Sequence, residues 1–212
     1  MAKITRAKQL TDRDRGILLD LARCRVLSLE QIKKEYWPKA KERTCLERLA
    51  RLEKSGYLKS LDISAEKPGT HMKVFCLDNK GRREVCGPDG LDKDNVFITH
   101  GKQNEILHQV RTNQVYFRLS KTEKETYKIG DLLEKERGGG RRAAGGAEVP
   151  DAAYTSDEGE EIYVEADTGQ YTGKQVKSKV SSFLGKKVVW VCPQNRENFL
   201  RKHGATGEFL TY

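Results

Sequence analysis

The stretch PKAKERTCLERLARLEKSG, residues 38–56, predicts an amphipathic helix on which the fold depends. At 100° per residue, one side carries the apolar residues Cys45, Leu46, Leu49 and Leu52. The other side carries Arg43, Thr44, Glu47, Arg51 and Lys54, flanked by Lys41 and Arg48. Pro38 before the helix and Gly56 after it are typical of helix ends. The pattern indicates one buried stripe and one basic face, which an ordinary surface helix also shows, so its neighbours decide the interpretation.

Two short helices are predicted before this segment. Thr11 with Asp14, and Ser28 with Gln31, have the spacing of capping boxes, and apolar residues at helical spacing follow each pair. Three short helices with tight connections, the last of them basic, are typical of a helix-turn-helix.

A β-hairpin is predicted directly after the third helix. Residues 57–61 and 71–77 read as strands around a turn that contains Pro68 and Gly69, with Lys67 and Lys73 at or beside its tip. Because a generic three-helix bundle gives no reason for such a hairpin, we predict a winged helix-turn-helix over residues 10–85, closed by a short helix over 78–85.

Charge is distributed unevenly along the chain. Residues 1–85 hold 21 Lys and Arg against 12 Asp and Glu, whereas the remaining residues are balanced, so the net charge of +9 belongs to the first part. This asymmetry assigns polyanion binding to the first module. Residues 1–9 read either as a basic arm that follows a phosphate backbone or as a solvated tail.

The composition excludes several classes of protein. No apolar run approaches a membrane span and the N-terminus lacks the apolar region of a signal peptide, so we expect a cytoplasmic protein without a membrane partner. The five cysteines are scattered without a C-x-x-C pair, which indicates free thiols.

The second half predicts an α/β domain over residues 99–212, after a linker at 86–98. Its predicted elements are helices at 99–119, 173–183 and 195–202, strands at 127–133, 149–154, 161–167, 187–192 and 208–212, and a flexible Gly-rich loop at 134–147. The order of elements indicates a two-layer or three-layer domain, and the whole chain is expected to be α+β or α/β.

Several stretches together resemble the replication-relaxation family of plasmids, phages and conjugative elements. They are LTDRDRGILLDLARCRVLSLEQIKKEYW (10–37), LDNKGRREV (77–85), HGKQNEILHQVRTNQVYF (100–117), PDAAY (150–154) and YVEADTG (163–169). The resemblance implies a winged helix-turn-helix joined to a reduced restriction-endonuclease fold. It also implies a role in the maintenance, copying, transfer or regulation of the DNA of mobile elements.

The resemblance to restriction-type nucleases raises the question of a Mg²⁺ site. Asp151 and Glu165 match its two carboxylates, and Glu105 matches the acidic residue on the leading helix. Asp167 stands where such a nuclease has a lysine, and a carboxylate there disfavours cleavage. The alternative hypothesis is a metal-dependent nuclease, in which Lys174 or Lys177 of the next helix replaces that lysine. Only in this alternative do we expect a cofactor, Mg²⁺.

The leading hypothesis is a non-catalytic protein that binds double-stranded DNA and acts in replication, transfer or transcription regulation. Thr44, Arg48 and Arg51 are expected to contact base edges in the major groove. Lys41, Arg43 and Lys54 are expected to contact phosphates, and Lys67 or Lys73 is expected to lie near the adjacent minor groove. Glu47 either accepts a hydrogen bond from cytosine or pairs with a neighbouring arginine. The second domain is expected to form a homodimer or to contact a protein; a third reading is an accessory protein that contacts a relaxase or a replication initiator.

Overall fold

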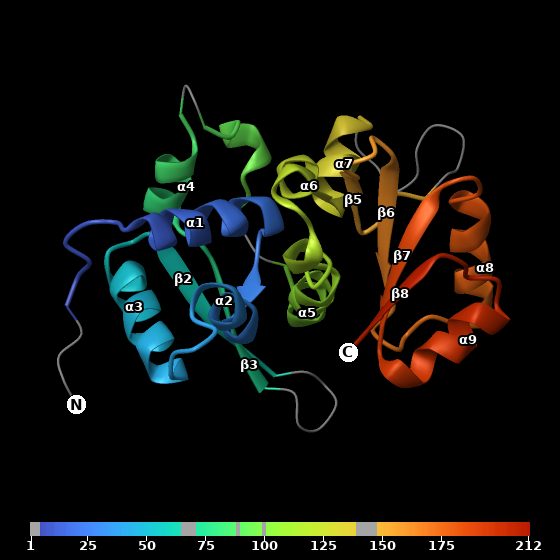
Figure 1. Ribbon diagram of the computed structural model, residues 1–212, viewed down its shortest axis with the longest axis horizontal. Coiled ribbons are helices and arrows are strands. Elements are labelled where there is room, and N and C mark those ends of the chain that lie inside the picture. The colour runs from blue at the N-terminus through green and yellow to red at the C-terminus, as the bar shows by residue number, and fades with distance from the viewer. Residues whose placement is uncertain (1–4, 65–70, 88–89, 99–100, 139–147) are drawn as a thin grey trace. The chain divides into compact units, whose positions relative to one another are not determined.

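The computed structural model describes residues 5–64, 71–87, 90–98, 101–138 and 148–212 of the chain. The fold is mixed, with helices and two small sheets, and it divides into two compact units, Met1–Val110 and Arg111–Tyr212 (Figure 1). Helix α5 (Gln103–Thr112) spans the division. Within the described residues, no helix combines the length and the apolar character that a membrane crossing requires.

The first unit contains helices and one three-stranded sheet. Its elements are α1 (Asp12–Cys24), β1 (Leu27–Ser28), α2 (Leu29–Tyr36), α3 (Glu42–Lys54), β2 (Leu58–Ser64), β3 (His71–Leu77), α4 (Asn79–Val85) and the 3₁₀ helix η1 (Lys93–Asn95). Both predicted capping boxes are present, at Thr11 with Asp14 and at Ser28 with Gln31. Asp78 is the N-cap of α4, and its side chain accepts the N–H of the next residue, Asn79.

The sheet of the first unit has the order β1-β3-β2, and all its pairs are antiparallel. Strand β1 was not predicted; Leu27 pairs with Phe75 and Ser28 with Val74, so this short strand closes one edge of the hairpin. The buried stripe of α3 consists of Cys45, Leu49 and Leu52, whereas Leu46, which was predicted with them, is only partly buried. Helix α3 lies beside β2 (Figure 1), which orients its opposite face outward.

The second unit contains a five-stranded sheet with the order β4-β5-β6-β7-β8. Its elements are η2 (Tyr116–Arg118), α6 (Lys121–Thr126), β4 (Lys128–Ile129), α7 (Gly130–Glu136), β5 (Ala152–Thr155), β6 (Glu161–Ala166), α8 (Gly173–Ser182), β7 (Lys187–Cys192), η3 (Gln194–Arg196), α9 (Glu197–Lys202) and β8 (Glu208–Thr211). The first three strands are antiparallel, whereas β6, β7 and β8 run parallel.

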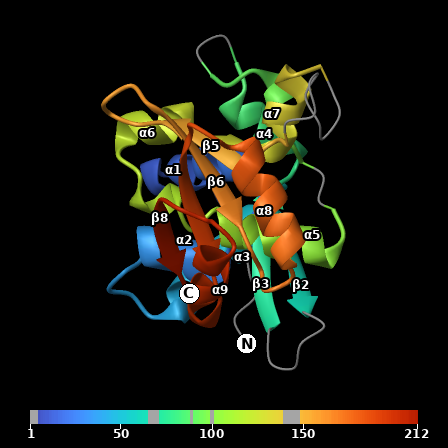
Figure 2. The same cartoon turned by 90° about the vertical axis from the view of Figure 1, so that its right-hand side faces the viewer.

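Helix α8 lies over one face of this sheet (Figure 2). Val176 and Phe183 from α8 pack in the core with Tyr163 of β6 and Trp190 of β7, and Leu200 of α9 joins the same cluster. Because successive side chains of a strand alternate between faces, Glu165 shares the α8-facing side of β6 with Tyr163.

Three predicted elements differ from the structure. The helix predicted over 99–119 is α5 followed by the separate 3₁₀ helix η2. The strand predicted over 127–133 is only two residues long, because Gly130 begins α7. The Gly-rich loop predicted at 134–147 therefore starts inside α7, and its residues 139–147 lie outside the described part of the chain.

Candidate functional site

Helix α3 carries the exposed basic face that the sequence predicts. Its buried side is fixed by the core residues of the first unit, and Lys41 is the residue before its first turn. Lys41, Arg43, Thr44, Glu47, Arg51 and Lys54 are exposed. Arg51 has no ion-pair or hydrogen-bond partner for its guanidinium among the described residues, so both edges of its donor fork are available to a ligand.

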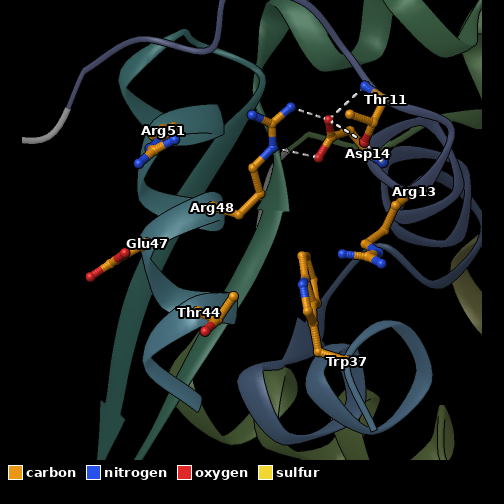
Figure 3. Close-up of a pocket in the computed structure, with 8 residues that line it drawn as sticks. All are labelled: Thr11, Arg13, Asp14, Trp37, Thr44, Glu47, Arg48 and Arg51. Carbon is orange, nitrogen blue, oxygen red and sulfur yellow. Dashed lines mark hydrogen bonds and ion pairs between the residues drawn. The ribbon is translucent and has the colours of Figure 1, made fainter. Parts of the chain in front are cut away.

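A hollow of about 330 Å³ lies between this face and the beginning of α1 (Figure 3). Polar or charged residues line it together with one aromatic residue, Trp37: Thr11, Arg13, Asp14, Trp37, Thr44, Glu47, Arg48 and Arg51. In Figure 3, Arg48 points across the hollow toward Asp14, whereas Glu47 and Arg51 point away from that pair.

Arg48 is held inside the first unit. Its Nε donates to Asp14 Oδ1 at 2.9 Å, and its Nη2 donates to Asp14 Oδ2 and to the carbonyl of Gln9 at 3.1 Å. Asp14 is fully buried and also accepts the N–H and the hydroxyl of Thr11. Burial alone raises the pKa of Asp14, but the bonds from Arg48 and Thr11 outweigh burial and leave the pKa below its ordinary value.

Two further basic side chains that the sequence assigned to DNA contacts, one on α3 and one on β3, have internal partners. Arg43 Nε donates to Glu47 Oε1 at 2.8 Å, which gives Glu47 the arginine-pairing role that the sequence left open. Both side chains are largely exposed, so the pair is weak and open to exchange for a phosphate. Lys73 on β3 pairs with Asp62 on β2 at 2.9 Å. The other predicted wing residue, Lys67, lies outside the described residues.

Arg13 is a site residue that the sequence reasoning missed. Its guanidinium carbon lies 4.8 Å from the centroid of the buried Trp37 ring, on the α1 side of the hollow (Figure 3). Such a contact restrains the arginine while it stays exposed. The sequence did contain one indication of this role, because Arg13 lies in the first turn of α1. The helix dipole favours acidic residues there, so an arginine at that position suggests a separate stabilising contact.

The basic arm is anchored where it is described. The N–H of Ala7 donates to Ser55 Oγ at 2.9 Å, at the end of α3, and the carbonyl of Gln9 accepts from Arg48. Residues 5–9 therefore run along α3, whereas residues 1–4 lie outside the described part.

The second unit brings the two predicted carboxylates together. Asp151 precedes β5 and its Oδ2 accepts the N–H of Ala166 at 2.8 Å, which places it beside Glu165 on β6. Glu165 is fully buried; its Oε1 accepts the hydroxyl of Tyr171 at 2.5 Å and contacts Lys179 Nζ at 2.5 Å. Burial, and then the charge of Asp151, raise the pKa of Glu165 to about 8, although Lys179 and Tyr171 oppose the shift.

The lysine of this cluster is not one that the sequence nominated. Lys179 of α8 lies beside Glu165, whereas Lys174 and Lys177 of the same helix are exposed. Glu105 belongs to the first unit, where its carboxylate accepts the N–H of Lys102 at 3.0 Å before α5 begins.

Asp167 has a structural role. Its Oδ1 accepts the backbone N–H groups of Gly169, Gln170 and Tyr171, at 2.8 to 3.2 Å. Its Oδ2 accepts from Arg196 at 2.9 Å, and Arg196 also donates to the carbonyl of Tyr171. Every oxygen of this buried carboxylate is therefore used to hold the turn after β6.

These residues do not fit the metal site of a restriction-type nuclease. In the described ranges of the chain, no three His, Cys, Asp or Glu side chains are grouped so that they could hold a metal ion. Glu165 Oε1 already contacts the ammonium group of Lys179 and accepts the hydroxyl of Tyr171. Asp167 forms an ion pair with Arg196. As predicted, the cysteines are thiols rather than disulfides, and burial raises the pKa of Cys45 and Cys192 to about 11.

The comparison with known families agrees with the resemblance in the sequence. The sequence model of one family, described as Replication-relaxation, matches residues 18–184, which is more than half of the chain. The chain belongs to the replication-relaxation family. Membership of this family indicates a role in the replication of mobile elements. No curated protein and no solved structure matches this family member.

Proposed function

We propose that this family member binds double-stranded DNA through the exposed face of α3 and acts in the replication, transfer or regulation of a mobile element. The observation that carries the proposal is Arg51, an exposed arginine on a rigid helix whose guanidinium has no partner among the described residues. Arginine binds guanine through two parallel hydrogen bonds, which makes it the side chain most suited to base recognition.

The arrangement of the first unit supports a winged helix-turn-helix. Three helices precede the β2–β3 hairpin, and the third helix presents Thr44 and Arg51 on its exposed face. In this proposal these two side chains contact base edges, while Lys41, Arg43 and Lys54 contact phosphates and Lys67 or Lys73 lies near the minor groove. Arg48 changes role: its bonds to Asp14 and Gln9 make it a positioning residue that orients α3.

The second unit is proposed to be a non-catalytic domain derived from a restriction-endonuclease-like fold. Lys179 and Tyr171 bind Glu165 Oε1, and Arg196 binds Asp167, so these carboxylates hold the domain together and this favours a structural role over a catalytic one. Its role would be to form a homodimer or to contact a relaxase or a replication initiator. Two-fold pairing predicts half-sites about one or two helical turns apart.

The test of DNA binding selects bound fragments from the host replicon and then measures affinity by fluorescence anisotropy. Arg51→Ala is expected to cost about 1–3 kcal/mol on the selected site. Arg51→Lys keeps the charge but loses the fork, so it should weaken the selected site and leave unrelated DNA unaffected. Arg83→Ala on α4 is the matched control, because Arg83 is an exposed arginine of the same unit outside the α3 face.

The proposal fails if both Arg51 variants bind the selected fragments as tightly as the unchanged chain. A nuclease is tested separately, by incubating supercoiled DNA with the protein and Mg²⁺. Nicking that disappears in both Asp151→Ala and Glu165→Ala would overturn the non-catalytic assignment of the second unit.

A further inference from the structure

The hollow between α1 and α3 contains hydrogen-bond donors that the fold leaves unpaired (Figure 3). Its lining has two carboxylates, Asp14 and Glu47, and each already pairs with an arginine. Two other arginines of the lining, Arg13 and Arg51, have no ion-pair or hydrogen-bond partner for their guanidinium groups among the described residues. The hollow therefore carries positive charge that its own carboxylates do not compensate.

Trp37 contributes a further unpaired donor. Its side chain is only 6% exposed, and its indole Nε1 has no hydrogen-bond partner in the part of the chain that the structure describes. A buried indole N–H normally donates a hydrogen bond, because leaving it unpaired costs free energy. In Figure 3 the ring stands between Thr44 of α3 and Arg13 of α1, so the unpaired N–H and the unpaired guanidinium belong to the same hollow.

Arg13 is held beside this ring without losing its donors. Its guanidinium carbon lies 4.8 Å from the centroid of the Trp37 ring, and the arginine remains exposed. Because the attraction of a cation to an aromatic face uses no hydrogen-bond acceptor, the N–H groups of Arg13 stay available to a ligand. A cation and a neutral N–H donor thus lie together before any ligand binds, and phosphate oxygens accept hydrogen bonds from both kinds of donor.

We propose that the hollow binds a phosphate group of the DNA backbone through the guanidinium of Arg13 and the Nε1–H of Trp37. The inference rests on the proposed function, in which Arg51, on the α3 side of the hollow, contacts a base of the same duplex. Phosphate contacts fix the position of a protein on DNA without reading its sequence. Arg13 therefore adds a contact from α1 to those of the α3 face and fixes the register in which Arg51 meets its base.

The first test follows the indole N–H signals of the unchanged chain by NMR. The two tryptophans give two such signals, and Trp37→Phe assigns them. A duplex selected from the host replicon is expected to shift the Trp37 signal. The Trp190 signal should stay in place, because Trp190 Nε1 already donates to the carbonyl of Thr206 at 3.0 Å.

Inorganic phosphate is the second probe in the same experiment. At equal phosphate concentration it should shift the Trp37 signal less than the duplex does, because the other contacts of the α3 face hold the duplex in place. A larger response to inorganic phosphate would make the hollow a site for a free anion and would overturn the assignment to DNA.

The second test measures DNA affinity by fluorescence anisotropy over a range of salt concentrations. Arg13→Ala is expected to weaken binding to the selected fragments and to unrelated DNA by the same factor, on the order of tenfold. It should also reduce the slope of log affinity against log salt concentration by about 1. Arg15→Ala is the matched control and should leave both quantities nearly unchanged. Arg15 is an exposed arginine of the same helix that lies outside the hollow, beside Glu84 and the carbonyl of Leu10.

The results separate this inference from the proposed function. The phosphate site is refuted if DNA binds but the Trp37 signal does not shift, and if Arg13→Ala binds as Arg15→Ala does. The proposed function stands in that case, provided that Arg51→Lys weakens the selected site. In the opposite case Arg13→Ala and the Trp37 signal respond as expected while both Arg51 variants bind as tightly as the unchanged chain, so the hollow binds phosphate and base recognition by α3 is refuted. A chain that binds no DNA refutes both.

Discussion

The guanidinium of Arg48 on α3 binds both carboxylate oxygens of Asp14 on α1, 34 residues away in sequence. The same carboxylate closes the capping box of α1 with Thr11, and the same guanidinium binds the carbonyl of Gln9 in the arm. One contact therefore sets the position of α3 relative to the start of α1. The exposed face of α3 is oriented by this pair, and Arg48 itself is partly buried.

Arg48→Met should destabilise the first unit, because it leaves the fully buried Asp14 without its main charge partner. We expect a loss of about 3–5 kcal/mol in the free energy of unfolding, measured by urea denaturation. The matched control is Arg43→Met, which breaks the exposed Arg43–Glu47 pair and should cost under about 1 kcal/mol. Equal stability of the two variants would contradict the positioning role of Arg48.

The stability contributed by Asp14 should depend on pH in a defined direction. The pKa of Asp14 in the folded chain lies below its ordinary value, so the unfolded state takes up the proton first as the pH falls. The contribution is therefore fully present above about pH 4, the ordinary value for aspartate, and is lost as the pH falls through the lower folded pKa.

Comparison with Asp14→Asn isolates this effect. The difference in urea midpoint between the unchanged chain and the variant should be largest at neutral pH and should shrink below about pH 4. A difference that grows as the solution is acidified would show that the folded pKa of Asp14 is raised.

The sequence predicted elements whose signal is local. The capping boxes at Thr11 and Ser28 and the continuous apolar run of β7 are all present. The residues from Gly130 to Glu136 were misread, because a short apolar run such as Ile129 with Leu132 and Leu133 fits a strand as well as a helix. Strand β1 was missed because two residues are too few to show the alternating pattern of a strand.

The candidate sites were predictable only in part, because the partner of a side chain is set by the tertiary structure and can be distant in the sequence. The apolar stripe and the exposed face of α3 followed from its period, but nothing near Arg48 in the sequence indicates Asp14. Lys179 was accessible to sequence reasoning: it follows Val176 by three residues and precedes Phe183 by four, so it lies on the buried stripe of α8. A lysine on such a stripe needs a buried carboxylate, which Glu165 provides.

Asp167→Lys should unfold the second unit rather than create a nuclease. This substitution restores the lysine of the restriction-type pattern, but it removes the acceptor of three backbone N–H groups and places a cation against Arg196. The lost bonds and the buried like charges should cost more than about 3 kcal/mol. Urea denaturation measures the loss, with Glu197→Gln as the control, because Glu197 forms a more exposed pair with Arg201.

The same variant should show no Mg²⁺-dependent nicking of supercoiled DNA. A stable Asp167→Lys chain that cleaves DNA would show that the turn after β6 tolerates the change and that the carboxylates of this unit can bind metal.

Gly207→Ala should destabilise the second unit more than Gly185→Ala does. Both glycines have positive φ, +105° and +78°, so alanine is strained at each position by about 1–2 kcal/mol. An added Cβ at Gly207 would lie 2.3 Å from the carbonyl oxygen of Val188 on β7, whereas none of the neighbouring atoms of the described chain lies within 4 Å at Gly185. Gly185→Ala therefore measures the backbone strain alone. The additional loss of stability in Gly207→Ala, measured from the urea midpoints, reports how closely the backbone before β8 approaches β7. Equal midpoints for the two variants would mean that the residues before β8 shift freely, and that the parallel pairing of β7 with β8 does not fix the position of Gly207.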